Sequence, residues 1–166
     1  MTKERKIMKL YLKQKVFAWN DRFFVKDENG SDRFSVEGEI FSLGKRLHIY
    51  DANGIEIALI RQKLIAWLPR YFVEIDGKVM CEIVKEFTFL NHSYRLEGLP
   101  WRLNGDFMAH DYSLENNGKQ IMRMYKEWFT WGDSYVLDID DNLNPIEEFT
   151  CLCVALAVDC AMARNN

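Results

Sequence analysis

The sequence predicts a mainly β fold, a closed antiparallel barrel of about twelve strands, in six hairpin units, around a hydrophobic C-terminal α-helix. Two observations lead to this prediction. Tight-turn signals recur along the chain and are followed by apolar residues at even spacing, as in β-hairpins. The segment from about 145 to 164 reads as a helix that is apolar on every side. A sheet of about twelve strands tends to close, and the barrel then has room for a helix.

Four turns end in Asn-Gly or Asp-Gly, at Gly30, Gly54, Gly77 and Gly118. The fourth and sixth residues after each glycine are apolar, and this even spacing places them on one face of a strand: Phe34 and Val36, Ala58 and Ile60, Cys81 and Ile83, Met122 and Met124. The same face is predicted to continue to the tenth residue: Ile40, Leu64, Phe87 and Trp128. A large apolar residue recurs at the thirteenth position, in the connection to a second strand: Leu43, Trp67, Leu90 and Trp131.

Two further units fit the template without its opening turn, which completes the six. The N-terminal unit has apolar residues at equivalent places: Leu10, Leu12, Val16, Trp19, Phe23 and Val25. A shortened unit follows later in the chain: Trp101, Leu103, Phe107, Tyr112 and Leu114. Strands are therefore expected from about residue 8 to 140. Because no Pro/Gly/Ser-rich linker interrupts the chain, residues 1–166 are predicted to form one domain.

The C-terminal helix is expected to be wrapped by the rest of the chain. Its apolar run of about 14 residues is shorter than the ~20 needed to span a bilayer, so no transmembrane span is predicted. Asn144 is the predicted N-cap and Pro145 the first helical residue. Asp159 is the only charge in the run. Since an unpaired buried carboxylate is costly, Asp159 is predicted to meet a basic, tyrosine or backbone donor near the barrel rim.

The net charge of −3 and the pI of about 5.7 argue against a nucleic-acid-binding protein. The first fifteen residues are rich in lysine but lack the apolar core of a secretory signal, so we expect a cytoplasmic protein. In that reducing compartment the cysteines are predicted to be free core residues: Cys81, Cys151, Cys153 and Cys160.

Motifs of known catalytic sites are missing from the sequence. It contains no Gly-x-Ser-x-Gly elbow, Gly-rich phosphate loop or His-Glu-x-x-His pair, so we expect neither an enzyme nor a cofactor. The three histidines lie in different units, and His110 and Asp111, as neighbours on a strand, would point to opposite faces. The acidic stretch 138–144 resembles the start of a calcium loop, but Leu143 replaces the required glycine and Phe149 the required glutamate. We therefore interpret it as a turn before the helix and predict no metal site.

Several segments, in their order and spacing, resemble the LURP-one-related family, particularly its bacterial branch: 34–38, 51–54, 60–63, 103–107, 128–135 and the terminal apolar helix with Asp159. That family is similar to the tubby C-terminal domain and to phospholipid scramblases. The resemblance implies a tubby-like barrel of twelve strands threaded by a helix, in agreement with the strand count above. Tubby domains bind phosphoinositides, and scramblases are associated with lipid movement and calcium. No site residue of these proteins can be carried over to this chain.

Basic residues recur at similar distances after the turn glycines: Arg61, Lys63, Lys85 and Lys126. The barrel is predicted to gather them at a similar height, where they would hold an anionic lipid headgroup or phosphate, reinforced by the N-terminal lysines. Lys85 and Lys126 fall on even offsets, which turns them inward. The alternative interpretation is a solvated face, with the cations paired to neighbours such as Glu86 and Glu127.

Two functions are compatible with these observations. The first is a non-enzymatic binding module for anionic phospholipid, or another phosphate-bearing ligand, peripherally bound at the inner membrane surface. It predicts a contiguous basic patch. The alternative is an intracellular scaffold that binds proteins without binding lipid, through exposed aromatic residues such as Trp19, Trp67 or Trp131. It predicts an unusually large apolar surface patch.

Overall fold

The computed structural model describes residues 6–13, 22–39, 43–89, 92–129 and 132–163, which form twelve strands and one helix. The elements are β1 (Ile7–Lys13), β2 (Phe23–Lys26), β3 (Asp32–Gly38), β4 (Arg46–Tyr50), β5 (Glu56–Gln62), β6 (Arg70–Ile75), β7 (Lys78–Glu86), β8 (Ser93–Glu97), β9 (Trp101–Asp106), β10 (Asp111–Asn116), β11 (Lys119–Phe129), β12 (Gly132–Asp140) and α1 (Pro145–Met162).

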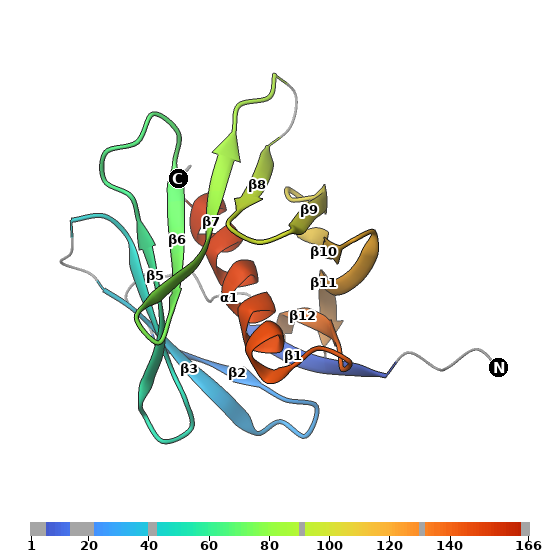
Figure 1. The fold of residues 1–166 in the computed structure, drawn as a ribbon. Coiled ribbons are helices and arrows are strands. Elements are labelled where there is room, and N and C mark those ends of the chain that lie inside the picture. The colour runs from blue at the N-terminus through green and yellow to red at the C-terminus, as the bar shows by residue number, and fades with distance from the viewer. Residues whose placement is uncertain (1–5, 14–21, 40–42, 90–91, 130–131, 164–166) are drawn as a thin grey trace.

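The strands form one antiparallel sheet that wraps around α1 (Figure 1). Neighbours in sequence pair with one another, and β1 also pairs with β12 over seven residues. The sheet therefore begins at β8, runs back through β1 to β12, and ends at β9. The turn at 98–100 joins these two outer strands, which leaves a nearly closed barrel. The predicted twelve-stranded barrel with an internal helix is confirmed.

Residues on the inner face of the wall form a continuous core with the helix. In β6, for example, Tyr71, Val73 and Ile75 are buried and alternate with partly exposed residues. The residues predicted at the fourth and sixth positions after the turn glycines are all buried except Phe34, which is half-buried with its ring centroid 5.1 Å from that of Phe149. The shortened unit is buried as well: Trp101, Leu103, Phe107, Tyr112 and Leu114.

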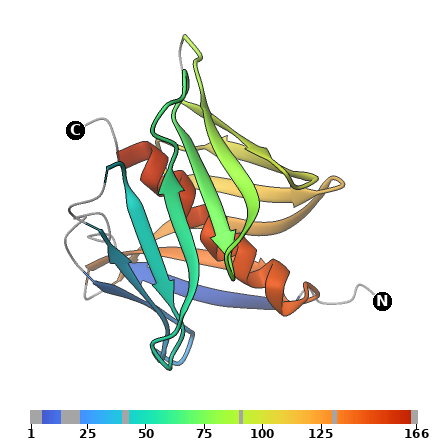
Figure 2. The same ribbon diagram turned by 60° about the vertical axis from the view of Figure 1, so that its left-hand side comes forward.

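The helix α1 crosses the barrel obliquely and is enclosed on all sides (Figure 2). Every residue from Thr150 to Ala161 is buried. Asn144 is the N-cap and forms a capping box. The Oδ1 of Asn144 accepts a hydrogen bond from the backbone N–H of Glu147, and the Glu147 carboxylate accepts one from the backbone N–H of Asn144, both at 3.0 Å. No helix among the described residues is long and apolar enough to cross a membrane.

Two strands end earlier than the repeat predicted. Leu64 and Phe87 were expected on the inner face, but they lie beyond the ends of β5 and β7 and are exposed. The cause is the length of the helix. It ends at Met162, so residues farther along the wall have no core to pack against. Other residues of the predicted pattern lie outside the described residues: Val16, Trp19, Ile40, Leu90 and Trp131.

Removing the helix is expected to unfold the domain, because the inner face of the whole wall packs on it. A chain ending at Asn144 should show no cooperative urea transition by circular dichroism, whereas a chain ending at Ala163 should unfold cooperatively. The milder variant Leu156→Ala should lower the free energy of unfolding by about 2–5 kcal/mol. A cooperative transition in the chain that ends at Asn144 would contradict this expectation.

Candidate functional site

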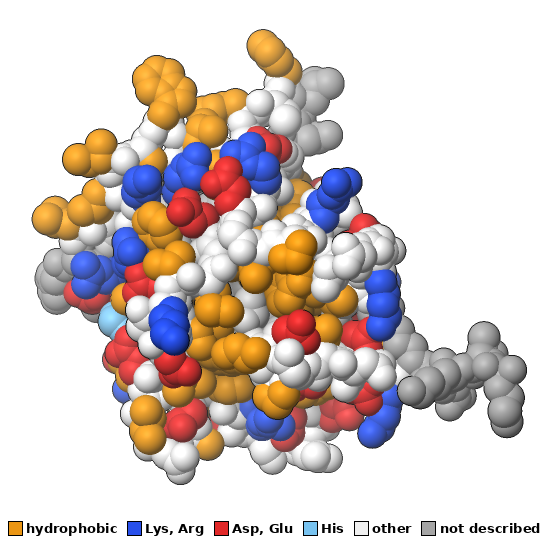
Figure 3. Space-filling model, viewed as in Figure 1, with side chains coloured by type: hydrophobic (Ala, Val, Ile, Leu, Met, Phe, Trp, Pro, Cys, Tyr) orange, Lys and Arg blue, Asp and Glu red, His pale blue; other side chains and the backbone are white. Residues whose placement is uncertain are grey.

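Large apolar side chains protrude from three neighbouring loops at the end of the barrel where α1 terminates. We call these residues the crown: Leu43, Leu64, Ile65, Trp67, Phe87 and Phe89. Trp67 is 96% exposed, Ile65 92% and Phe89 107%. Figure 3 shows hydrophobic side chains standing out at this end of the molecule, the upper end in that view. Exposed apolar side chains at the opposite end are fewer and less exposed, such as Ile55 and Val79. An apolar surface concentrated in this way marks an interaction site.

Contacts between the crown loops hold them next to one another. The backbone N–H of Gln62, at the end of β5, donates to the carbonyl of Lys45 in the β3–β4 loop at 2.8 Å. The backbone N–H of Lys85, on β7, donates to the carbonyl of Pro69 at 3.0 Å, which joins the β5–β6 loop to β7. Gly44 has a φ of +87°, and a Cβ there would lie 2.7 Å from Cδ2 of Leu64. The crown is therefore one surface, and a side chain at Gly44 would disturb it.

The two ends of the barrel differ in charge. The turns at the end where α1 begins contain no Lys or Arg but several carboxylates: Asp27, Glu28, Asp51, Asp76 and Asp141. Among the described residues of the loops at the crown end, the charged side chains are Arg22, Lys45, Lys63 and one carboxylate, Glu39. The overall charge of −3 thus conceals a polarity along the barrel axis, with its cationic end at the crown.

The arginines behind the crown are bound to carboxylates on β7 and β8. Arg70 donates to Glu82 at 3.1 Å and to Glu97 at 2.9 Å. Arg95 donates to Glu97 at 2.6 Å and to Glu86 at 2.8 Å. Lys and Arg therefore alternate with Asp and Glu in the band below the crown (Figure 3). This part of the wall is a charge-balanced network rather than the contiguous basic patch that the sequence suggested.

The four predicted anion-binding residues are not brought together. Arg61 pairs with Glu74, and its guanidinium lies 4.3 Å from the ring centroid of Phe72 on the outer wall. The Nζ of Lys63 lies 5.8 Å from the centroid of the Phe72 ring as well.

Lys85 and Lys126 face inward, as predicted, because they pair in register with the buried Tyr94 and Tyr135. Lys126, on β11, is separated from β7 by β8, β9 and β10. The predicted cluster is thus wrong, because the repeat places these residues at similar heights but on different faces and sides of the barrel.

Two of the N-terminal lysines, Lys6 and Lys9, are paired with carboxylates outside the crown. Lys6 has its Nζ 3.8 Å from Asp141, in the turn before α1, and Lys9 has its Nζ 3.6 Å from Asp138 on β12. Sequence reasoning missed Phe89, although a large apolar residue that recurs in each connection was a signal for the crown. Trp67 was correctly singled out as an exposed aromatic residue.

The sequence matches the LURP-one-related family over residues 8–158. The chain belongs to the LURP-one-related family. The uncharacterized protein YxjI of Bacillus subtilis is 36% identical over 160 residues, which are 96% of each chain. An X-ray structure of a protein from Arabidopsis thaliana is similar with a TM-score of 0.62, at 16% identity, over 93% of this chain and 91% of that one. This structural likeness shows the fold alone.

In this LURP-one-related chain Asp159 is buried in the last turns of α1, with 2% of its surface exposed. Within the described part of the chain its Oδ1 has no hydrogen-bond partner, so the predicted donor is not found. The hydroxyl of the nearby Tyr112 instead donates to the carbonyl of Ala155 at 3.3 Å. Burial raises the pKa of Asp159 well above its ordinary value, which favours the neutral acid over the carboxylate.

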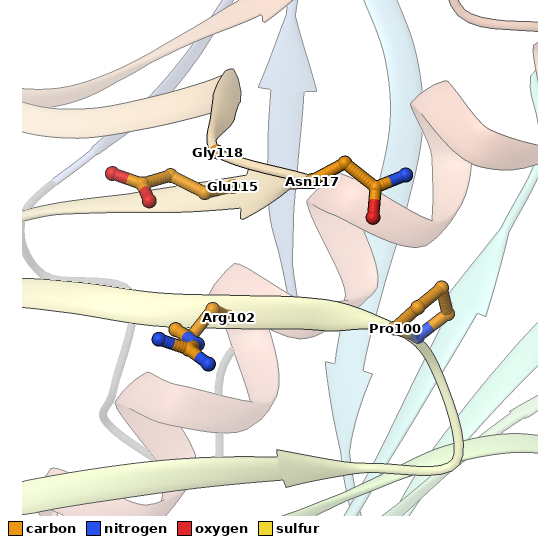
Figure 4. Close-up of a pocket in the computed structure, with 5 residues that line it drawn as sticks. All are labelled: Pro100, Arg102, Glu115, Asn117 and Gly118. Carbon is orange, nitrogen blue, oxygen red and sulfur yellow. The ribbon is translucent and has the colours of Figure 1, made fainter.

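A shallow polar pocket of about 270 Å³ lies on the outside of the barrel, between the turn at 98–100 and the β10–β11 turn. Figure 4 shows its lining: Pro100, Arg102, Glu115, Asn117 and Gly118. The lining offers a guanidinium, a carboxylate and a carboxamide, which suit a small polar molecule. The described lining contains no hydroxyl, thiol or imidazole that could act as a nucleophile.

His110 and Asp111, adjacent in sequence, do not form a catalytic dyad. Asp111 accepts two hydrogen bonds from Arg123, at 2.9 and 3.0 Å. The His110 ring instead stacks on Tyr135, with centroids 4.9 Å apart. Burial, together with the charge of Lys126, lowers the pKa of His110.

Replacing Asp159 with Asn is expected to remove a pH dependence of stability. Because the folded protein holds the Asp159 proton more tightly than the unfolded chain does, the wild type loses stability as the pH rises above the ordinary pKa of 3.8. The Asp159→Asn variant cannot ionise, so it should be more stable at neutral pH by about 1–3 kcal/mol. The difference in unfolding free energy between Asp159→Asn and wild type should disappear near pH 3.8, the ordinary pKa of the carboxyl group.

Urea unfolding between about pH 4 and 8 measures this difference. The exposed Asp76→Asn is the matched control and should show no such trend. Equal stability of Asp159→Asn and wild type at every pH would contradict a neutral Asp159.

Proposed function

We propose that this protein is a non-enzymatic module that docks peripherally on a membrane surface carrying anionic phospholipid, with its crown inserted at the lipid interface. The observation that supports the proposal best is the crown itself. Trp67, Ile65 and Phe89 are almost completely exposed to water, on loops that are tied to one another. Burying such side chains at the boundary of headgroups and acyl chains removes this apolar surface from water.

The charge polarity of the barrel supports the same orientation. The described loops at the crown end carry Arg22 and Lys63, whereas the charged residues of the turns at the opposite end are all carboxylates. An anionic surface attracts the first end and repels the second, so the long-range field and the apolar contact favour one orientation. Membership of the family is compatible with lipid binding, but the proposal does not depend on it.

The same crown also fits the alternative function, a scaffold that binds a protein partner without binding lipid. Large exposed aromatic side chains such as Trp67 and Phe89 are typical of the centres of protein interfaces. The two functions differ in what the wild-type protein binds: the alternative predicts no association with vesicles of any composition. Vesicle binding therefore separates them directly.

Removing two crown aromatics is expected to abolish most membrane binding. The variant Trp67→Ala with Phe89→Ala should bind vesicles of mixed neutral and anionic phospholipid more than tenfold more weakly than wild type, because each side chain loses its apolar burial. Co-sedimentation at low salt measures the change. The matched control, Ile55→Ala with Val79→Ala, removes exposed apolar residues from the opposite end. Equal losses in both variants, or no binding by the wild type, would refute the proposal.

A further inference from the structure

A cavity of about 230 Å³ opens at the end of the barrel where α1 begins, opposite the crown. Its walls come from β1, β3, β5 and the first turns of α1, which lie beside β1 in both Figure 1 and Figure 2. The cause is the width of the barrel, because a wall of twelve strands encloses more space than one helix fills. The helix lies closest to β6 and β7, so a gap remains between its first turns and the strands on the other side.

The inside of this cavity is apolar. Leu10 and Leu152 belong to its lining and are buried in the core. Four further apolar lining residues are only partly buried, so part of their surface still faces water: Met8, Phe34, Ile57 and Phe149. Covering this surface with an apolar group is favourable. Because sites for drug-sized ligands begin at ~300 Å³, the cavity suits a smaller molecule.

Two side chains of opposite charge complete the lining. Arg33, on β3, is exposed, and Glu148, on α1, is half-buried. Burial raises the pKa of Glu148, while the positive charge of Arg33 acts in the opposite direction, so the two groups lie close enough to interact. Within the described part of the chain neither side chain forms an ion pair or a hydrogen bond. Both charges are therefore available to a ligand in the cavity.

We propose that this cavity binds a free amino acid with a large apolar side chain. Such a molecule carries a carboxylate and an ammonium group on one carbon atom, directly beside its apolar part. The guanidinium of Arg33 holds the carboxylate through paired hydrogen bonds, and the carboxylate of Glu148 holds the ammonium group. The apolar side chain of the ligand packs between Phe34 and Ile57. This site is independent of membrane docking, since the crown lies at the other end of the barrel.

Ligands with a single charge fit the cavity less well. An anion such as a fatty acid would meet Glu148 and the carboxylates in the turns of this end, among them Asp27 and Asp51. A simple amine would be attracted by Glu148 but repelled by the guanidinium of Arg33. Only a molecule with both charges satisfies both lining groups, which favours the zwitterion.

Isothermal titration calorimetry on the full chain tests the proposal with L-phenylalanine and L-leucine. Two analogues of phenylalanine each lack one charge: phenethylamine has no carboxylate, and phenylpropionate has no ammonium group. Each analogue should bind at least about tenfold more weakly than phenylalanine, because one charge-assisted pair is lost. Glycine, which keeps both charges but lacks the apolar group, should also bind at least about tenfold more weakly.

Two variants assign each charge of the ligand to its partner. Glu148→Gln should weaken the binding of phenylalanine about tenfold but not that of phenylpropionate, which has no ammonium group. Arg33→Gln should weaken the binding of phenylalanine about tenfold but not that of phenethylamine, which has no carboxylate. The matched control, Arg102→Gln with Glu115→Gln, removes the same two kinds of charge from the polar pocket on the outside of the barrel. It should bind phenylalanine like wild type.

The outcomes keep this inference apart from the proposed function. The crown variant, Trp67→Ala with Phe89→Ala, should bind phenylalanine like wild type, and a loss there would overturn the site. The site is also wrong if neither phenylalanine nor leucine binds the wild type at millimolar concentration, whatever the vesicle experiments show. Equal affinity for phenylalanine and either analogue would overturn it too, as would equal losses in the control and in the two site variants. The analogue comparison needs only the wild type, so it remains decisive if a variant folds poorly.

Discussion

A helix that is apolar on every side can be stable in water only when it is enclosed, and the rest of this structure follows from that constraint. The strands provide the enclosure, because their inner faces present apolar residues to α1. The pairing of β1 with β12 joins the first and last strands in the sequence. The capping box at Asn144 satisfies backbone and side-chain groups where the helix enters. The helix and the inner face of the wall thus form one shared hydrophobic core, and neither has another way to bury its apolar surface.

Asp140 and Asp159, the buried carboxylates among the described residues, are stabilised in different ways. Asp140, at the end of β12, lies 2.7 Å from the Nζ of Lys119. Burial alone raises its pKa, but the hydrogen bonds from Lys119 and Asn142 outweigh this effect and lower the pKa to about 2. The Oδ1 of Asp159 has no hydrogen-bond partner in the described structure, and burial raises the pKa of this side chain, which favours its neutral form. A charged group is therefore retained at the rim, near water, and a neutral one inside the core.

The proposed functional surface, the crown, lies where this enclosure ends. Beyond the last turn of α1 the wall has no core to cover, so the apolar residues of the crown loops turn to solvent. The charges follow the same axis, with carboxylate turns at one end and lysine-bearing loops at the other. The proposed peripheral docking would use both properties, since an anionic surface would attract the cationic end and the interface would accept the aromatic side chains. On the wall behind them, Arg70 and Arg95 both pair with Glu97.

Much of the fold was determined by the sequence itself. Turn glycines, even apolar spacing and an all-round apolar helix are local patterns, and they specify hairpins and a central helix without knowledge of distant contacts. The site was decided by the tertiary structure. Whether Arg61 is available depends on Glu74 across the strand pair, and whether Leu64 is buried depends on where α1 ends. Strand register and helix length relate residues far apart in the chain, and local periodicity carries no information about such relations.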